Sequence, residues 1–295
     1  MKSIDILVQN QMNKLQTWLA EQRVRNILAS KISPQVYDDE AVFQTLMAQY
    51  APPPEYGYDP YSTWVRGMER AQGLLKQITG LRESPKRTLE LACGDGMVSA
   101  ALMSYGHDVT VMDMDDWRDS RARACPFVRV NVDEDDLSSF CSGSDLVFSY
   151  NSFEHFAKPD LVFEKILTCV KPGGWIFLSF GPLYAGPYGL HAYRSMPMPF
   201  PQYLFSEEFI DQKLAQLGIR DLGKDLQKLQ PLNGWLIRQF DKLWNSDQVS
   251  IQYYKREVSK KYLKIIQKYP AAFQGRNLYL EDVTTLAVHV LLQRK

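Results

Sequence analysis

Apolar residues at roughly helical spacing dominate the start of the chain. Residues 4–30 carry Ile, Leu and Val in a pattern typical of a helix with one apolar face, and a weaker version follows at 41–50. Prolines interrupt this pattern between 51 and 60, because proline lacks an amide donor. Residues 61–78 regain helical spacing. The pattern predicts leading helices, a linker or lid-forming loop, and a further helix.

The middle of the chain alternates between strand-like and helix-like patterns. Alternation of this kind predicts a parallel sheet with helices on both faces. Strands are expected near 88–92, 108–112, 127–130, 145–150 and 175–180, with helices near 97–105 and 160–170.

The last third of the chain is less regular. Residues 181–205 combine five prolines with three glycines and several aromatics, which predicts a segment that covers a site. A helix is expected after Ser206, ending at Gly218. Residues 235–269 are expected to form one or two further helices, and the β-rich run at 283–292 a final strand.

Composition narrows the range of partners. The chain has 295 residues, of which 45% are hydrophobic, so it can bury a large core. Lys plus Arg and Asp plus Glu each number 34, so no net charge attracts nucleic acid or an anionic membrane. A small-molecule substrate is therefore expected, with no nucleic-acid or membrane partner.

Cysteine usage and hydropathy predict a soluble protein of the cytoplasm. Cys93, Cys125, Cys141 and Cys169 contain no CxxC pair, which favours a reduced setting. The chain shows neither a signal-peptide pattern at its start nor the roughly 18 apolar residues that a membrane span needs.

The candidate chemistry begins between Leu89 and Asp113. A short apolar run leads into Cys93-Gly94-Asp95-Gly96, a helical segment follows, and a second apolar run ends at Asp113. This is the pattern of a βαβ unit, in which small residues let a cofactor approach the backbone and the acid binds ribose hydroxyls. Nicotinamide, flavin and methyl-transferring enzymes share it, so the unit alone predicts a nucleoside cofactor and no particular one.

Several ordered motifs narrow this choice, because together they resemble class I S-adenosylmethionine-dependent methyltransferases. The resemblance covers roughly residues 85–220. The motifs are Leu89-Glu90-Leu91-Ala92-Cys93-Gly94-Asp95-Gly96, Asp113, Asp133, Asp145-Leu146-Val147-Phe148-Ser149 and Val170-Lys171-Pro172-Gly173-Gly174.

The resemblance implies an α/β fold, namely a Rossmann-like doubly wound sheet of seven strands with the last strand antiparallel, plus a helical cap. The implied domains are an N-terminal helical cap or lid at 1–80, an S-adenosylmethionine-binding core at 81–230, a helical insertion in the cap at 231–275 and the final strand of the core at 276–295.

The resemblance also implies a cofactor site for S-adenosylmethionine, with S-adenosylhomocysteine as product. Its residues would be Glu90, Ala92, Gly94, Asp95, Gly96, Asp113, Met114, Asp133, Ser149 and Tyr150. Substrate-binding residues would be Asn151, Tyr184 and Tyr188. Structural roles stay open for the acids: Glu90 as the partner of a lysine, Asp113 as a helix cap, and Asp133 as one acid of a solvated turn.

His191 and His155 are the candidate catalytic bases, with Glu154 beside the second. Histidine titrates near neutrality, which suits removal of a proton from a hydroxyl. Glu154, His155 and His191 also form a weaker candidate set for a divalent metal. Some methyltransferases carry a Glu-x-x-Glu-His metal motif here, but this chain has Asn151 in the first position.

The sequence thus predicts a methyltransferase, with O-methylation of a small sugar-like or secondary-metabolite hydroxyl as the first hypothesis. N-methylation of a small amine, a non-catalytic methyltransferase-like binding module and an NAD-dependent oxidoreductase are the alternatives. A homodimer is an open possibility.

Overall fold

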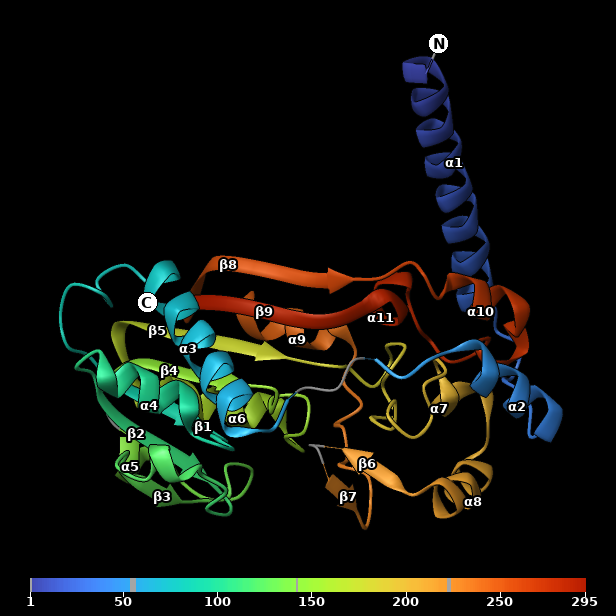
Figure 1. Cartoon of the computed structure of the whole chain (residues 1–295). Coiled ribbons are helices and arrows are strands. Elements are labelled where there is room, and N and C mark those ends of the chain that lie inside the picture. Colours follow the sequence, from blue (N-terminus) through green and yellow to red (C-terminus); the bar gives the residue numbers. More distant parts are fainter. Residues whose placement is uncertain (1, 54–56, 142, 222–223) are drawn as a thin grey trace.

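A mixed sheet of seven strands forms the centre of the protein, for which a computed structural model describes residues 2–53, 57–141, 143–221 and 224–295 (Figure 1). The strand order is β3-β2-β1-β4-β5-β9-β8. The strands are β1 Arg87–Leu91, β2 Asp108–Asp113, β3 Phe127–Arg129, β4 Ser144–Tyr150, β5 Val170–Phe180, β8 Val249–Val258 and β9 Thr285–Arg294. A separate hairpin pairs β6 Ile219–Asp221 with β7 Lys224–Leu226.

The direction of the strands confirms the predicted fold class. Strands β1 to β5 pair in parallel, whereas β9 runs antiparallel to both β5 and β8. The last strand of the chain is therefore inserted antiparallel into a Rossmann-like sheet, as the sequence predicted.

Helices cover both faces of the central strands, and alternate residues of each strand point to opposite sides. Leu89 and Val147 pack with α6 (Pro159–Cys169) and α9 (Ile237–Trp244). Val111 and Phe148 pack with α3 and α4 on the other face. Helices α3 Pro60–Gln77, α4 Met97–Ser104 and α5 Ser138–Cys141 complete this part of the molecule.

A third apolar cluster builds a second body beyond the carboxyl end of β5 (Figure 1). It joins the end of α1 to loop 181–205 and to residues 262–283. The first turns of α1 extend away from this body (Figure 1). The helices of this region are α1 Lys2–Ala29, α2 Glu40–Gln49, α7 Pro201–Leu204, α8 Glu207–Leu217, α10 Leu263–Lys268 and α11 Leu280–Thr284.

The predicted helical insertion at 231–275 needs a correction. It contains α9 and α10, but residues 249–258 form the edge strand β8, paired with β9. Much of β8 is exposed, including its charged residues Lys255 and Glu257. Charged side chains are common on edge strands, and here they obscure the apolar alternation that marks a buried strand. The proposed domain boundaries themselves stay a prediction.

The prediction of four reduced cysteines is wrong for two of them. Cys141 and Cys169 form a disulfide that joins the end of α5 to the end of α6. Cys93 and Cys125 are free and buried. The pairing was not evident in the sequence, because 28 positions separate the two residues and only the fold brings the helix ends together.

Within the described ranges, each helix is too short or too polar to cross a membrane.

Candidate functional site

The glycine turn between β1 and α4 provides open space for a ligand. Ala92, Gly94 and Gly96 all have positive φ angles, of 51°, 52° and 67°. A Cβ atom built on Gly94 would meet no atom within 4 Å. The turn therefore exposes its backbone on one side, which is what close approach of a cofactor requires.

Glu90 lies beneath this turn rather than at its surface. It is only 3% exposed, and its Oε2 accepts a hydrogen bond from the amide of Ser99, at 3.3 Å. Burial raises the pKa of Glu90 to about 8, so the side chain is protonated at neutral pH. Glu90 thus fixes the first turns of α4 against the sheet and supports the glycine turn from below.

Asp113 ends β2 directly beside the same turn. Its Oδ2 accepts the amide of Gly94 at 2.9 Å, and its Oδ1 accepts the amide of Met114 at 2.8 Å. A carboxylate accepts about four hydrogen bonds, so acceptor capacity remains for a ribose hydroxyl beside the backbone amides that Asp113 already binds. The Met114 side chain is 59% exposed. The structure thus places Asp113, the predicted ribose ligand, in contact with the predicted glycine turn.

Asp95 lies in the turn and Asp133 lies on the chain after β3, and the carboxylate of each already accepts a backbone amide. Asp95 Oδ1 accepts the amide of Met97 at 3.0 Å. Asp133 Oδ1 accepts the amide of Lys158 at 3.1 Å, immediately before α6. The predicted contact of Asp133 with adenine therefore relies on its second oxygen.

Three consecutive residues at the end of β4 differ in their orientation. Ser149 is 1% exposed and donates its hydroxyl to the carbonyl of Leu91 at 3.0 Å, so it joins β4 to β1. Tyr150 is half-buried, and Asn151 is exposed with a φ of 52°. Tyr150 and Asn151 are better placed than Ser149 to contact a ligand.

Two arginines of α3 were not identified as site residues from the sequence. Arg66 donates to the carbonyl of Gly57 at 2.9 Å and lies 3.4 Å from Oδ2 of Asp95. The guanidinium of Arg70 lies 4.6 Å from the centre of the Tyr150 ring and, within the described ranges, pairs with no carboxylate. Their spacing of four residues places them on one helix face, a signal that was available in the sequence. This pair suits the carboxylate of an amino-acid moiety.

His155 and His191 are brought together by the fold. Their rings stack with centres 5.1 Å apart. His155 Nδ1 lies 2.7 Å from the carbonyl oxygen of Pro231. Since a carbonyl only accepts, Nδ1 carries the proton and Nε2 carries the lone pair of the neutral ring. Burial lowers the pKa of both rings, to about 4 for His191, where neighbouring His155 lowers it further.

Glu154 is not available as an ionised ligand. It is 1% exposed, its Oε1 accepts the amide of Gly181 at 2.9 Å, and burial raises its pKa to about 8. In the part of the chain that the structure describes, no three His, Cys, Asp or Glu side chains are arranged to hold a metal ion. The set of Glu154, His155 and His191 does not fit a divalent metal.

The predicted substrate tyrosines lie in the second body. Tyr184 is 37% exposed and packs edge-on against Tyr203. The hydroxyl of Tyr188 is hydrogen-bonded to that of Tyr262 on the chain before α10, and their rings are in contact. Tyr188 therefore joins loop 181–205 to the start of α10 within the second body. Tyr184 is partly exposed and can contact a ligand.

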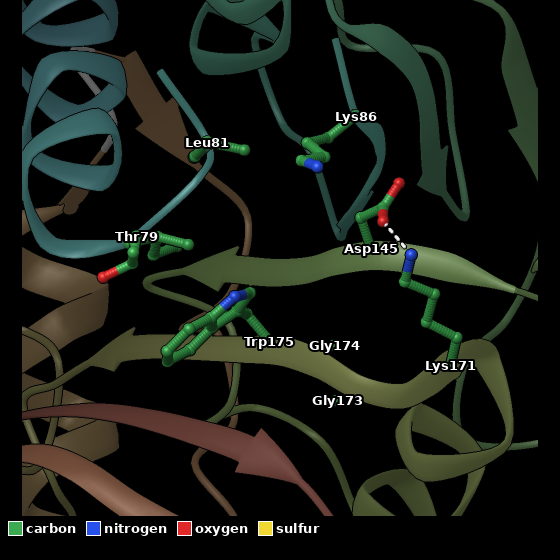
Figure 2. A pocket seen from close by; sticks show the side chains of 9 residues that line it. Thr79, Leu81, Lys86, Asp145, Lys171, Gly173, Gly174 and Trp175 are labelled. Carbon is green, nitrogen blue, oxygen red and sulfur yellow. Dashed lines mark ion pairs between the residues drawn. The ribbon is translucent and has the colours of Figure 1, made fainter. Parts of the chain in front are cut away.

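Figure 2 shows a separate hollow from close by. It is lined by residues that include Lys86, Trp175 and the ion pair of Lys171 with Asp145. These residues lie near the amino ends of β4 and β5. Cofactors of doubly wound sheets bind at the carboxyl ends, so this hollow is not the candidate site.

The fold and the turn define a nucleoside-binding protein of the Rossmann-like class, and comparison with known families gives the particular one. A family model described as "Methyltransferase domain" matches residues 63–222. The chain belongs to this family, the class I S-adenosylmethionine-dependent methyltransferases, as the sequence motifs predicted.

Similar curated proteins match only part of the chain. The "Ubiquinone biosynthesis O-methyltransferase" of Bordetella avium is 33% identical over 101 residues, which are 32% of this chain and 42% of that protein. The protein of the same name from Hydrogenovibrio crunogenus is 30% identical over 112 residues, or 36% and 46% of the two chains. The chain thus spans less than half the length of these relatives.

The solved structures that match are more distant in sequence than the curated relatives. An S-adenosylmethionine-dependent methyltransferase from Listeria monocytogenes is 11% identical, with a TM-score of 0.46, covering 78% of this chain and 99% of that one. Another from Mesorhizobium loti is 15% identical, with a TM-score of 0.44, covering 76% and 96%.

Because Glu90 and Glu154 are buried, we expect the free energy of unfolding to fall as the pH rises. Both carboxyls have a usual pKa of 4.5 and a pKa of about 8 in the folded protein. Between these two pH values the folded state therefore binds more protons than the unfolded state. The stabilisation that results is complete below about pH 4.5 and is lost as the pH rises through about 8. We expect a lower melting temperature at about pH 9 than at about pH 6. A Glu90→Gln, Glu154→Gln variant should show a smaller difference in thermal unfolding monitored by circular dichroism.

The exposed Glu134 supplies the matched control for this experiment. Glu134→Gln should follow the wild-type dependence. A double variant with the same pH dependence as Glu134→Gln would contradict the assignment to Glu90 and Glu154.

Proposed function

We propose that the protein methylates a hydroxyl group of a small acceptor, with His155 as the general base. The observation that carries this proposal is the 2.7 Å contact of His155 Nδ1 with the Pro231 carbonyl, which leaves the Nε2 lone pair for a proton. His155 follows β4 by five residues, at the edge of the sheet where the glycine turn and Asp113 lie. The names of the similar curated proteins, which are O-methyltransferases, support the choice of oxygen over nitrogen.

The residues around the turn fit S-adenosylmethionine, which supplies an electrophilic methyl group when it is bound. Asp113 would accept the ribose hydroxyls, and the open face of Gly94 would admit the amino-acid part. Arg70 would pair with the carboxylate of that part. Glu90 would act indirectly, by holding the turn in place.

In this mechanism His155 accepts the proton of the acceptor hydroxyl at Nε2. The Pro231 carbonyl fixes the tautomer and stabilises the positive ring that results. Burial lowers the pKa of His155 below its usual value of 6.5, so the ring is already neutral at pH 7. Methyl transfer also requires the attacking oxygen to be aligned, which the stacked His191 ring would help to fix.

We further infer small-molecule partners and no nucleic-acid role, whereas the cytoplasmic location and a homodimer stay predictions. The zero net charge supports the absence of nucleic acid. The Cys141–Cys169 disulfide argues against the location, since such bonds are rare in the cytosol.

Thermal shifts with three ligands test the proposed cofactor. A ligand that binds only the folded state stabilises it, by about 2.7 kcal/mol at one hundred times Kd. We expect S-adenosylmethionine and S-adenosylhomocysteine to raise the melting temperature and NAD to leave it unchanged. A shift with NAD alone would indicate an oxidoreductase. If neither adenosyl compound raised the melting temperature, the protein would instead be a non-catalytic binding module that has lost its cofactor.

A further inference from the structure

A buried polar cluster includes His191, one of the two stacked histidines. It consists of His191, Arg194 and Asp221, whose side chains are 10%, 4% and 5% exposed. Arg194 Nε is 3.5 Å from Asp221 Oδ1, and His191 Nε2 is 3.9 Å from Asp221 Oδ2. Loop 181–205 supplies the first two residues and β6 the third, so three buried polar groups converge from two segments.

Two polar atoms in this cluster have no hydrogen-bond partner in the described part of the chain. Nδ1 of His191 and Nη1 of Arg194 are buried without a hydrogen bond to any described residue, whereas Nε of Arg194 faces the Asp221 carboxylate. A buried polar atom left unpaired costs about 1–3 kcal/mol. Two such atoms in one place point to a bound molecule that completes the hydrogen bonding.

The charges of the cluster define what kind of molecule this is. Asp221 already balances the charge of Arg194, and burial keeps His191 neutral by lowering its pKa to about 4. An anionic ligand would therefore face the Asp221 carboxylate. A hydrocarbon would leave the donors unpaired, which a site built for hydrogen bonding rejects strongly.

Flat faces beside the cluster favour a ring. The His191 ring lies 5.1 Å from that of His155 and 5.7 Å from that of Tyr193, measured between centres. Aromatic faces pack well against the C–H faces of a sugar or cyclitol.

We propose that His191, Arg194 and Asp221 bind a second hydroxyl group of the methyl acceptor, and that the acceptor is a neutral polyhydroxyl ring compound. This inference rests on the proposed methyl-transfer function. Because the His155 and His191 rings are in contact, one hydroxyl at His155 and another at the cluster fall within the width of a single ring. Arg194 and Asp221 would then determine which acceptors are accepted, and neither takes part in proton removal.

Calorimetric titration of the S-adenosylhomocysteine-loaded protein with four probes tests the proposal. The probes are methyl glucoside, methyl galactoside, myo-inositol and glucose 6-phosphate. We expect at least one neutral probe to bind more tightly than glucose 6-phosphate. Arg194→Gln should weaken that probe at least tenfold and leave the affinity for S-adenosylhomocysteine unchanged. Arg238→Gln, which alters a half-buried arginine that donates to the Asn277 carbonyl, is the matched control.

Breaking one side of a buried ion pair is often destabilising, so an Arg194→Gln, Asp221→Asn variant removes both charges together and should show the same loss. Tighter binding of glucose 6-phosphate, equal affinity in the Arg194 and Arg238 variants, or no binding of any neutral probe would each overturn the proposal. The methyl-transfer function fails separately, by loss of S-adenosylhomocysteine binding to the wild-type protein.

Discussion

Replacing Asp113 with alanine is expected to weaken binding of S-adenosylhomocysteine by about 1–3 kcal/mol, a factor of roughly 5 to 150 in Kd. Asp113 ends β2 with acceptor capacity still available beside the open face of Gly94. Its loss would leave the ribose hydroxyls without their charged acceptor. Titration calorimetry on the purified variant measures the change directly.

Two further variants separate ligand contact from support of the turn, because Asp113 also accepts the Gly94 amide. Asp113→Asn keeps an acceptor for that amide and removes the charge, so it should also bind weakly while unfolding at a temperature close to wild type. Asp115→Ala removes a neighbouring exposed carboxylate that pairs with Arg129 on the surface, and it should bind normally. Equal affinities for all three variants would exclude Asp113 as the ribose ligand.

The cofactor half of the site was predictable because its signals are local. Residues 89–96 and Asp113 lie on adjacent parallel strands joined by one helix, so their order in the chain fixes their order in space. The antiparallel last strand was implied by the resemblance to the methyltransferase family. It predicted Ser149 less well, because the alternation of a strand does not reveal which hydroxyl is used to bond the neighbouring strand, as Ser149 does with Leu91.

The acceptor half was predictable only in part, because its contacts join distant segments. The sequence singled out both histidines, but the partner of His155 is the backbone carbonyl of Pro231, 76 positions away, which leaves no side-chain signal. Arg194 and Asp221 meet only because β6 lies against loop 181–205. Strand β8 was missed for a different reason, since the polarity of a sheet edge resembles that of a solvated helix.

Replacing His155 with glutamine is expected to lower kcat by a factor of about 10² to 10⁴, the usual contribution of a general base. Glutamine has no basic nitrogen to take the hydroxyl proton, although its amide still donates to a carbonyl such as that of Pro231. The affinity for S-adenosylhomocysteine should stay unchanged, because the cofactor residues lie on the glycine turn and β2. Transfer of a radiolabelled methyl group to the acceptor found in the probe titrations measures kcat.

The pH profile distinguishes a base from a structural residue. Burial lowers the pKa of His155, so wild-type kcat should be constant above neutrality and fall only in acid, where the ring gains a proton. His155→Gln should lose this acid limb together with its rate. His191→Ala is also expected to lose turnover while keeping cofactor affinity, through loss of alignment. If His191→Ala alone removed the acid limb, His191 rather than His155 would be the base, since only the group that accepts the proton sets the pH at which the rate falls.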